Sequence, residues 1–520
     1  MIRLLLTWML CLPLLAAPVS GRVSDGLRGL AGARVYPDRL VRVRPGDLPP
    51  VTVTGADGRF TLDLAPGDSV LAVEKSGWER DLVPLGELAR DVVLRPAPEY
   101  RREAVLVLRL DLPGSPGLRS DDELRAVLFG RRPGEASAAN YYYEISKGSL
   151  ELEEGALLHL DHPDAVAPAH PHPPRFMIDD RREDLVRWAM ARIKDLDLKP
   201  FDRVDNRTGA PGPDGEPDHL WIVAPGPSRT ITVDPEHFAA VCYLMPLPWN
   251  RRRHWTAVFF AEETPLGGIV HEGLHAMGEQ RVGDLYMDDL HPLTAGRWDV
   301  MDTGQFQGWD RYHQTGFPWQ EDTGYSPAQP MGWVRSELWY RGRFRATVAT
   351  LKVRGGWEGW LDPLERAPRE LPQRLVVADP RRRGRFWEFN VRRPWGFDRG
   401  RTGDRWGPGY EGLVVARVDP SLLARVDARL QVTRAFRGPV RVLNAHPGTP
   451  EPPLPRHPAG RWQLDGAAYN LGPGEVAAGQ DGPLRWEVLE VDGAGRMRVR
   501  VDLRRSPDAL RSRPEAPPSL

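Results

Sequence analysis

The chain has 520 residues, enough for several domains that each bury a hydrophobic core. Its 70 Lys and Arg nearly cancel its 71 Asp and Glu, and neither sign forms a long block, so the charge pattern argues against nucleic-acid binding and against a polybasic membrane anchor. The 52 Gly and 52 Pro are spread along the chain and favour strands, turns and loops over long helices.

The N-terminus carries the three-part pattern of a secretory signal. Arg3 is followed by an apolar run over residues 4–15 and by small residues over 16–21. The apolar run is shorter than the roughly twenty residues that a membrane helix needs, and no later segment approaches that length. The sequence therefore predicts a signal peptide at residues 1–18, export to the outside of the cell, and no membrane span.

Residues 19–97 are expected to form a small antiparallel β-sandwich. The segments "RFTLDL" (59–64) and "SVLAVEKS" (69–76) contain period-two alternation, and the turn residues of "GADGR" and "APGD" separate them from their neighbours. The "GARV" and "DGRFTL" elements resemble the carboxypeptidase-regulatory-like modules of secreted proteins. This resemblance implies a spacing, supporting or binding role, with no catalytic residue in the module.

Residues 98–335 mix helices and strands. The apolar strand "AVLVLRLDL" (104–112) precedes a helix with a capping box at Ser120 and Glu123 and a C-terminal stop at Gly130. We expect two further helices next, over residues 136–148 and 183–196, and then a buried strand, "HLWIVAP". All three precede the motif described below.

Helical periodicity ends after about residue 335. Segments such as "RLVVADP", "RFWEFNVRR" and "EGLVVARVD" are expected to be strands of one or two β-sandwich modules within residues 336–505, and residues 506–520 are expected to be disordered. The fold class that follows is a multidomain α+β chain.

The segment "TPLGGIVHEGLHAMGEQ" contains an H-E-x-x-H motif. Thr264 as N-cap and Pro265 in the first turn predict a helix over residues 265–280. His271 and His275 are four residues apart and project from one face, so both imidazoles can bind one zinc ion, while Glu272 can act as general base on a metal-activated water. Zinc hydrolases that cut peptide bonds use these residue types at this spacing.

The third zinc ligand is less directly specified. H-E-x-x-H-x-x-G opens the metzincin pattern, in which the third ligand follows the second histidine by six residues, but that position is Arg281, which cannot bind a metal. A short insertion, "EQRVG", would move the carboxylate to Asp284. The alternatives are Glu279, Asp288 and Asp289. Further along, "GRWDVMDTGQ" places Met301 in a Gly/Asp-rich turn suited to a methionine turn beneath the zinc.

Several ordered motifs resemble the secreted zinc endopeptidases of the immune inhibitor A type, the M6 peptidases, across roughly residues 104–419. They are "VLVLRLDLPG", "ELRAVLFG", "NYYYEISKGSLEL", the motif helix, "DLY", "WDVMDTG", "PMGWV" and "RRPWGFD…GYEGLVVARVD". The resemblance implies a metzincin-like zinc protease domain followed by β modules. It also implies that His271, Glu272 and His275 are ligand, base and ligand, that Asp284 is the carboxylate ligand, and that Met301 is the methionine of the turn.

The chain departs from the family pattern in two places. The compact "G-L-P-D" of the family is expanded to "GEQRVGD", and the usual "E-N-R" of the late β region is replaced by "NVR" at Asn390 to Arg392.

Two further segments bear on ligand and substrate binding. An acidic loop could offer oxygen ligands to calcium, with a plain polar turn as the alternative; its polar residues are Asp202, Asp205, Asn206, Asp214 and Asp218. The segment "HWTAVFFAEE" (254–263) predicts a strand beside the metal, where an edge strand would bind extended substrate by strand addition.

The sequence thus predicts a secreted zinc metalloendopeptidase, with a protein or peptide as substrate and no nucleic-acid partner. Two other functions remain open. One is a non-catalytic extracellular binding protein with a structural metal; the other is a metal hydrolase acting on a non-peptide bond.

Overall fold

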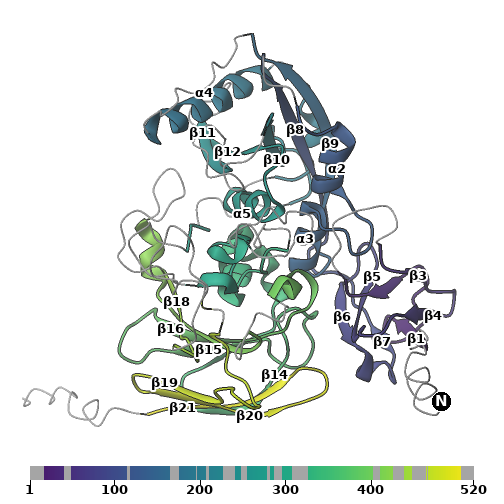
Figure 1. Ribbon diagram of the computed structural model, residues 1–520, viewed down its shortest axis with the longest axis vertical. Coiled ribbons are helices and arrows are strands. Elements are labelled where there is room, and N and C mark those ends of the chain that lie inside the picture. The colour runs from purple at the N-terminus through teal and green to yellow at the C-terminus, as the bar shows by residue number, and fades with distance from the viewer. Residues whose placement is uncertain are drawn as a thin grey trace, which may run out of the picture.

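The computed structural model describes residues 17–39, 48–113, 117–163, 175–194, 196–205, 210–226, 240–246, 254–277, 282–285, 295–306, 326–401, 410–425, 439–447, 464 and 466–504. These residues form five sheets and a small number of helices, a mixed α and β arrangement in which strands predominate (Figure 1). Residues 1–16 of the expected signal peptide and the tail from residue 505 lie outside the described residues. In the described part of the chain, no helix is long and apolar enough to cross a membrane.

The N-terminal module, residues 17–97, consists of two small sheets that enclose one hydrophobic core. Strand β4 shows the expected alternation, because Phe60, Leu62 and Leu64 are buried and the residues between them are exposed. One sheet has the order β4-β1-β7 and the other β3-β2-β5-β6. The strands are β1 (Ala17–Ser24), β2 (Arg34–Pro37), β3 (Thr52–Val53), β4 (Arg59–Leu64), β5 (Val70–Glu74), β6 (Asp81–Pro84) and β7 (Val92–Val93).

The middle region, residues 98–335, is built on a five-stranded sheet of order β11-β12-β10-β8-β9. All neighbours pair in parallel except β11, which is antiparallel to β12 at the edge. Parallel strands are buried on both faces, which explains the unbroken apolar run of β8. The strands are β8 (Arg101–Asp111), β9 (Leu150–Asp161), β10 (His219–Ala224), β11 (Val241–Pro246) and β12 (His254–Ala261).

Helices cover both faces of this sheet (Figure 1). Helix α4 packs on the face that presents Leu106 and Leu108, and α3 and α5 pack on the face that presents Val105 and Val107. The capping box expected for α2 is confirmed, because Ser120 and Glu123 exchange both hydrogen bonds. The helices are α2 (Asp121–Phe129), α3 (Ala138–Ile145), α4 (Arg175–Ile193) and α5 (Leu266–Met277).

The C-terminal region, residues 336–504, holds two sheets that face each other across a common core. They have the orders β13-β15-β16-β17-β18 and β14-β21-β20-β19. Their strands are β13 (Thr350–Val353), β14 (Trp357–Leu361), β15 (Arg374–Ala378), β16 (Phe386–Arg392), β17 (Gly412–Val418), β18 (Val440–Val442), β19 (Ala478–Asp481), β20 (Leu484–Val491) and β21 (Met497–Leu503).

The first of these sheets is buried on its other face as well. In β17, Leu413 and Val415 point into the core between the two C-terminal sheets, whereas Val414 and Ala416 belong to the same core as α3 and α5. The boundary expected near residue 335 therefore falls within one continuous hydrophobic core. Short 3-10 and π segments, η6 (Val334–Leu338) and η7 (Trp339–Thr347), carry the chain across it.

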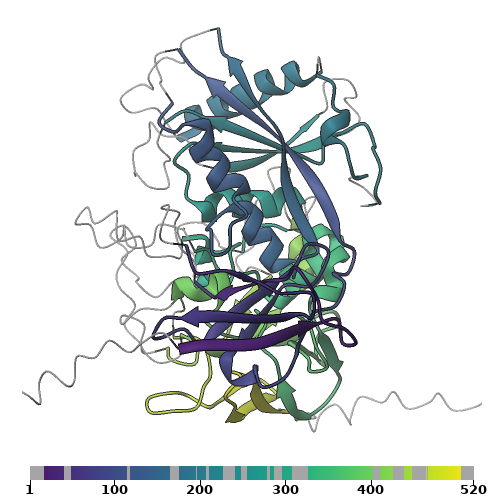
Figure 2. The ribbon, with the colours of Figure 1, turned by 90° about the vertical axis from the view of Figure 1, so that its right-hand side faces the viewer.

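The end of α3 joins all three regions. The buried Glu144 carboxylate pairs with Arg80 of the N-terminal module at 2.8 Å, and it accepts hydrogen bonds from Gln329 Nε2 and from the Phe397 N–H. At Gly148 the backbone has φ +85°, and a Cβ there would lie 2.3 Å from the Trp78 carbonyl oxygen. In Figure 2 the N-terminal module, in purple, lies in front of the green C-terminal region.

Candidate metal centre

Helix α5 carries the H-E-x-x-H motif and is almost completely buried. It begins at Leu266, one residue after the expected start, and it is described to Met277. The expected side-chain cap is not formed, because the buried Thr264 hydroxyl has no hydrogen-bond partner; instead, the Pro265 carbonyl accepts the N–H groups of Gly268 and Ile269. Burial against the core, rather than the cap, therefore stabilises this helix.

The small residues of α5 let neighbouring segments approach closely. A Cβ at Gly267 would lie 1.7 Å from the Gln305 carbonyl oxygen, so the helix backbone rests directly on η4 (Thr303–Phe306). A Cβ at Gly273 would lie 2.1 Å from Tyr142 Oη, which donates to the Val270 carbonyl at 2.9 Å. These contacts fix the motif helix between α3 and the turn that follows residue 295.

Gly273→Ala is expected to lower the free energy of unfolding by about 1–3 kcal/mol, because the added methyl group collides with the Tyr142 hydroxyl. In a Tyr142→Phe background the nearest ring atom, Cζ, lies 3.1 Å from that Cβ, so the same change should cost less. Urea unfolding of the four proteins in this cycle measures the difference. An equal cost of Gly273→Ala in both backgrounds would contradict the contact.

The structure brings His271, His275 and Asp284 together at one buried point. His271 Nε2 lies 2.9 Å from Asp284 Oδ1, and His275 Nε2 lies 3.1 Å from the same oxygen. The two Nε2 atoms are 3.1 Å apart. Within the described residues this is the one group of three metal-binding side chains. The rivals considered for the third position, Glu279, Asp288 and Asp289, lie outside those residues.

Both imidazoles are held in the tautomer that binds a metal through Nε2. His271 Nδ1 lies 2.8 Å from the Val300 carbonyl oxygen, and His275 Nδ1 lies 2.7 Å from the Val282 carbonyl oxygen. A carbonyl can only accept, so each Nδ1 carries a proton, and a ring in its neutral form presents a lone pair at Nε2. With both rings neutral, three acceptor atoms converge, and either a proton on Nε2 or a cation between them would remove their mutual repulsion.

The charges at this point follow from the same arrangement. Burial lowers the pKa of His271, but the hydrogen bond to Asp284 and the negative charges of Glu272 and Asp284 outweigh burial and raise that pKa to about 9. Burial raises the pKa of Asp284, whereas the two histidines lower it by a larger amount. A proton on His271 thus relieves the repulsion that a metal ion would also relieve.

The turn at residues 295–306 supports both segments that carry ligands. The Val300 carbonyl orients His271, and the Met301 carbonyl accepts the N–H of Leu285, next to Asp284, at 2.8 Å. Asp299 shapes the turn by accepting the N–H groups of Met301 and Met331 at 2.8 and 2.7 Å. Met301 itself is fully buried in the core that contains α5. The turn is therefore the scaffold of the site. The sequence indicated that Met301 lies in this turn, but it did not indicate the role of Asp299.

Glu272 lies on the same helix and is half-buried. Burial raises the pKa of its carboxyl group, and a hydrogen bond from the Cys242 backbone N–H acts in the opposite direction. Cys242 belongs to β11, so this contact ties Glu272 to the edge of the five-stranded sheet. The sequence gives no sign of this role for β11, because the short apolar segment around Cys242 looks like any buried strand.

The expected substrate strand requires a correction. Residues 254–261 do form a strand, but β12 has β10 on one side and β11 on the other. Its backbone hydrogen-bonding groups are paired on both sides, so it cannot accept an added strand. The edge beside α5 is β11, which has a partner on one side only among the described residues. Strand addition at this site would have to use β11.

Two carboxylates of the acidic loop that could offer ligands to calcium have a structural role. Asp202 accepts the N–H groups of Asp214 and Gly215, and Asp218 accepts those of Ala104, Arg203 and Val204. Asn206 lies outside the described residues. In the described part of this loop, no three His, Cys, Asp or Glu side chains bring ligand atoms together. These carboxylates therefore hold the turn that leads into β10.

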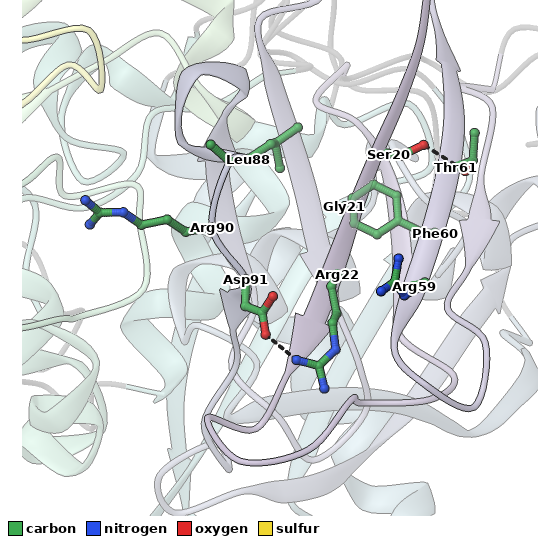
Figure 3. Close-up of a pocket in the computed structure, with 10 residues that line it drawn as sticks. Ser20, Gly21, Arg22, Arg59, Phe60, Thr61, Leu88, Arg90 and Asp91 are labelled. Atoms are coloured by element: carbon green, nitrogen blue, oxygen red, sulfur yellow. Dashed lines mark hydrogen bonds and ion pairs between the residues drawn. The ribbon is translucent and has the colours of Figure 1, made fainter.

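A hollow of about 540 Å³ on the N-terminal module is open to solvent (Figure 3). The Phe60 ring lies over Gly21, and Arg22 pairs with Asp91. Its described lining contains no histidine or cysteine. Its surface is part polar and part apolar, and Asp91, the one carboxylate of the lining, is paired with Arg22.

Two comparisons with known proteins return nothing: no protein-family model matches the chain, and no curated protein matches it. The geometry of the His271, His275 and Asp284 cluster is therefore the basis for assigning a function.

A zinc ion fits this cluster. Two neutral imidazoles and an ionised carboxylate form a three-residue donor set of the kind that catalytic zinc sites use. The Nδ1 hydrogen bonds to backbone carbonyls are the outer contacts that orient zinc-binding histidines. His271, His275 and Asp284 are thus the residues that would hold the ion, with Glu272 beside them.

Proposed function

We propose that this chain is a secreted zinc-dependent endopeptidase in which His271, His275 and Asp284 hold the metal and Glu272 is the general base. The observation that carries the proposal is the convergence of two Nε2 atoms and one carboxylate oxygen, with both Nδ1 protons committed to carbonyls. Export is supported by the signal-like pattern at residues 1–18. The M6-like motifs of the sequence support the choice of peptide bonds as substrate.

Zinc, when bound, would supply a Lewis acid that polarises the scissile carbonyl and lowers the pKa of the attacking water. The Glu272 carboxylate would accept the proton of that water and deliver it to the leaving amine. A raised pKa suits this role, because a carboxylate with a higher pKa is a stronger base towards the water. The backbone of β11, whose Cys242 N–H holds Glu272, would align an extended substrate beside it.

A chelator is expected to abolish cleavage of an unfolded protein such as casein, because removal of the zinc also removes the Lewis acid that the reaction needs. Zinc added in slight excess over the protein should restore the activity, whereas calcium or magnesium should not, since imidazole ligands favour zinc over these hard cations. The measurements are the rate of casein cleavage and the metal content by elemental analysis.

This experiment separates the proposal from its two alternatives. A protein that binds zinc and cleaves neither casein nor small esters would be a binding protein with a structural metal. A protein that hydrolyses esters or amides of small molecules, but never a peptide bond, would be a metal hydrolase of another class. The presence of Glu272 beside the cluster argues against the first of these, because a structural metal needs no base.

A further inference from the structure

Strand β16 carries three polar side chains at alternating positions, Glu388, Asn390 and Arg392, and all three are fully buried. The residues between them, Phe389 and Val391, point into the core between the two C-terminal sheets. The polar side chains therefore share the opposite face of the sheet, which packs on the middle region. This is the segment in which the sequence has "NVR" in place of "E-N-R".

Arg392 uses its guanidinium group to reach four partners. Nε pairs with Glu365 at 3.0 Å, and Nη2 pairs with Asp398 at 2.6 Å. Nη1 donates to the Trp298 carbonyl at 2.9 Å, and Nη2 donates to the Gln329 carbonyl at 3.0 Å. A buried charge is retained only where partners compensate for the loss of water, and the two carboxylates supply that compensation here. The two carbonyl contacts lie in the middle region.

One carbonyl contact, at Trp298, lies within the turn at residues 295–306, and the other, at Gln329, lies in the segment that follows it. Trp298 directly precedes Asp299, whose carboxylate also accepts the N–H of Met331, two residues after Gln329. Two residues beyond Trp298, the Val300 carbonyl accepts His271 Nδ1–H. Arg392 therefore holds together the same two chain segments that Asp299 joins. One of them contains the Val300 carbonyl, which orients the metal-binding ring of His271.

We infer that Arg392 is a positioning residue for the metal centre, through which the C-terminal sheet fixes the turn that orients His271. The inference rests on the proposed zinc site. It gives a function to the arginine of the "NVR" segment, and it predicts that metal binding depends on a residue of β16 that touches no ligand.

The test compares the full-length wild-type protein with Arg392→Gln. The zinc dissociation constant, measured by competition with a chromophoric chelator, is expected to rise about 10–100-fold, as it does when an outer partner of a zinc ligand is lost. The visible spectrum of the cobalt-substituted protein should also change, because the spectrum reports the arrangement of the ligands and not the stability of the fold.

Arg374→Gln provides the matched control. Arg374 is a buried arginine of the neighbouring strand β15, and it pairs with Glu388 at 2.6 Å, with Glu337 at 2.7 Å and with Ser336 Oγ at 3.0 Å. None of these partners lies in the turn at residues 295–306. The Arg374→Gln change should lower the thermal unfolding midpoint, as Arg392→Gln should. It should leave the zinc dissociation constant and the cobalt spectrum unchanged.

Should Arg392→Gln fail to fold, Asp398→Asn replaces it. Asparagine can still accept the Gln329 N–H that Asp398 Oδ1 accepts at 3.1 Å, but it removes the charge that anchors Arg392. A weakened zinc site is expected again, with a smaller change.

The inference is overturned if the variant tested binds zinc like the wild type with an unchanged cobalt spectrum, or if Arg374→Gln alters both equally. A wild-type protein that binds zinc but cleaves no peptide contradicts the proposed function and leaves this inference standing. A wild-type protein that binds no zinc contradicts both.

Discussion

Glu272→Gln is expected to reduce kcat/KM for a peptide substrate by about 10²–10⁴-fold while the bound zinc remains at the wild-type level. Glutamine has the shape of glutamate and can accept the Cys242 N–H, but it cannot accept and return a proton. The two measurements are steady-state cleavage of a fluorogenic peptide and the zinc content of the purified variant.

The thermal unfolding midpoint of Glu272→Gln serves as its control. Because burial raises the pKa of Glu272, removal of this carboxyl group should leave the midpoint close to that of the wild type or above it. Full peptide cleavage by the variant, with zinc bound, would exclude Glu272 as the base. Loss of zinc together with activity would instead assign it to metal binding.

Asp284→Ala is expected to weaken zinc binding by more than the roughly 10–100-fold that the loss of an outer partner costs, because it removes one of the three converging donors. The backbone contact from Leu285 to the Met301 carbonyl does not involve the lost side chain, so the segment can keep its path. The zinc dissociation constant of the variant, measured as for Arg392→Gln, gives the result.

Glu279→Ala is the companion variant, since Glu279 is one of the three alternative ligands that the sequence offers. It should bind zinc as the wild type does and cleave peptide at a similar rate. If instead Glu279→Ala loses zinc while Asp284→Ala retains it, the ligand set deduced from the geometry is incorrect.

The elements that local patterns specify were predictable from the sequence. The alternation in "RFTLDL", the capping box at Ser120 and the apolar run of β8 all have short-range causes, and each has the expected form in the structure. His271 and His275 belong to this class, because their shared helix face is fixed by their spacing alone. The position of Asp284 is different, since it depends on the path of a segment that no periodicity describes.

Features that depend on contacts distant in sequence were not predictable. The role of Arg392 depends on carbonyls at residues 298 and 329, and nothing in the letters "NVR" indicates those partners. The edge position of β11 depends on strand order, which an apolar segment does not reveal. The expected cap at Thr264 failed for a related reason: a helix that packs on all sides needs no side-chain cap to begin.

The sheet β13-β15-β16-β17-β18 lies between two apolar cores, one shared with the motif helix and one shared with the second C-terminal sheet. A layer that is covered on both faces cannot detach without exposing both cores to water. We therefore expect the residues on either side of position 335 to unfold together. In evolutionary terms, recombination could exchange the motif-bearing half and the C-terminal strands between related chains only as a single block.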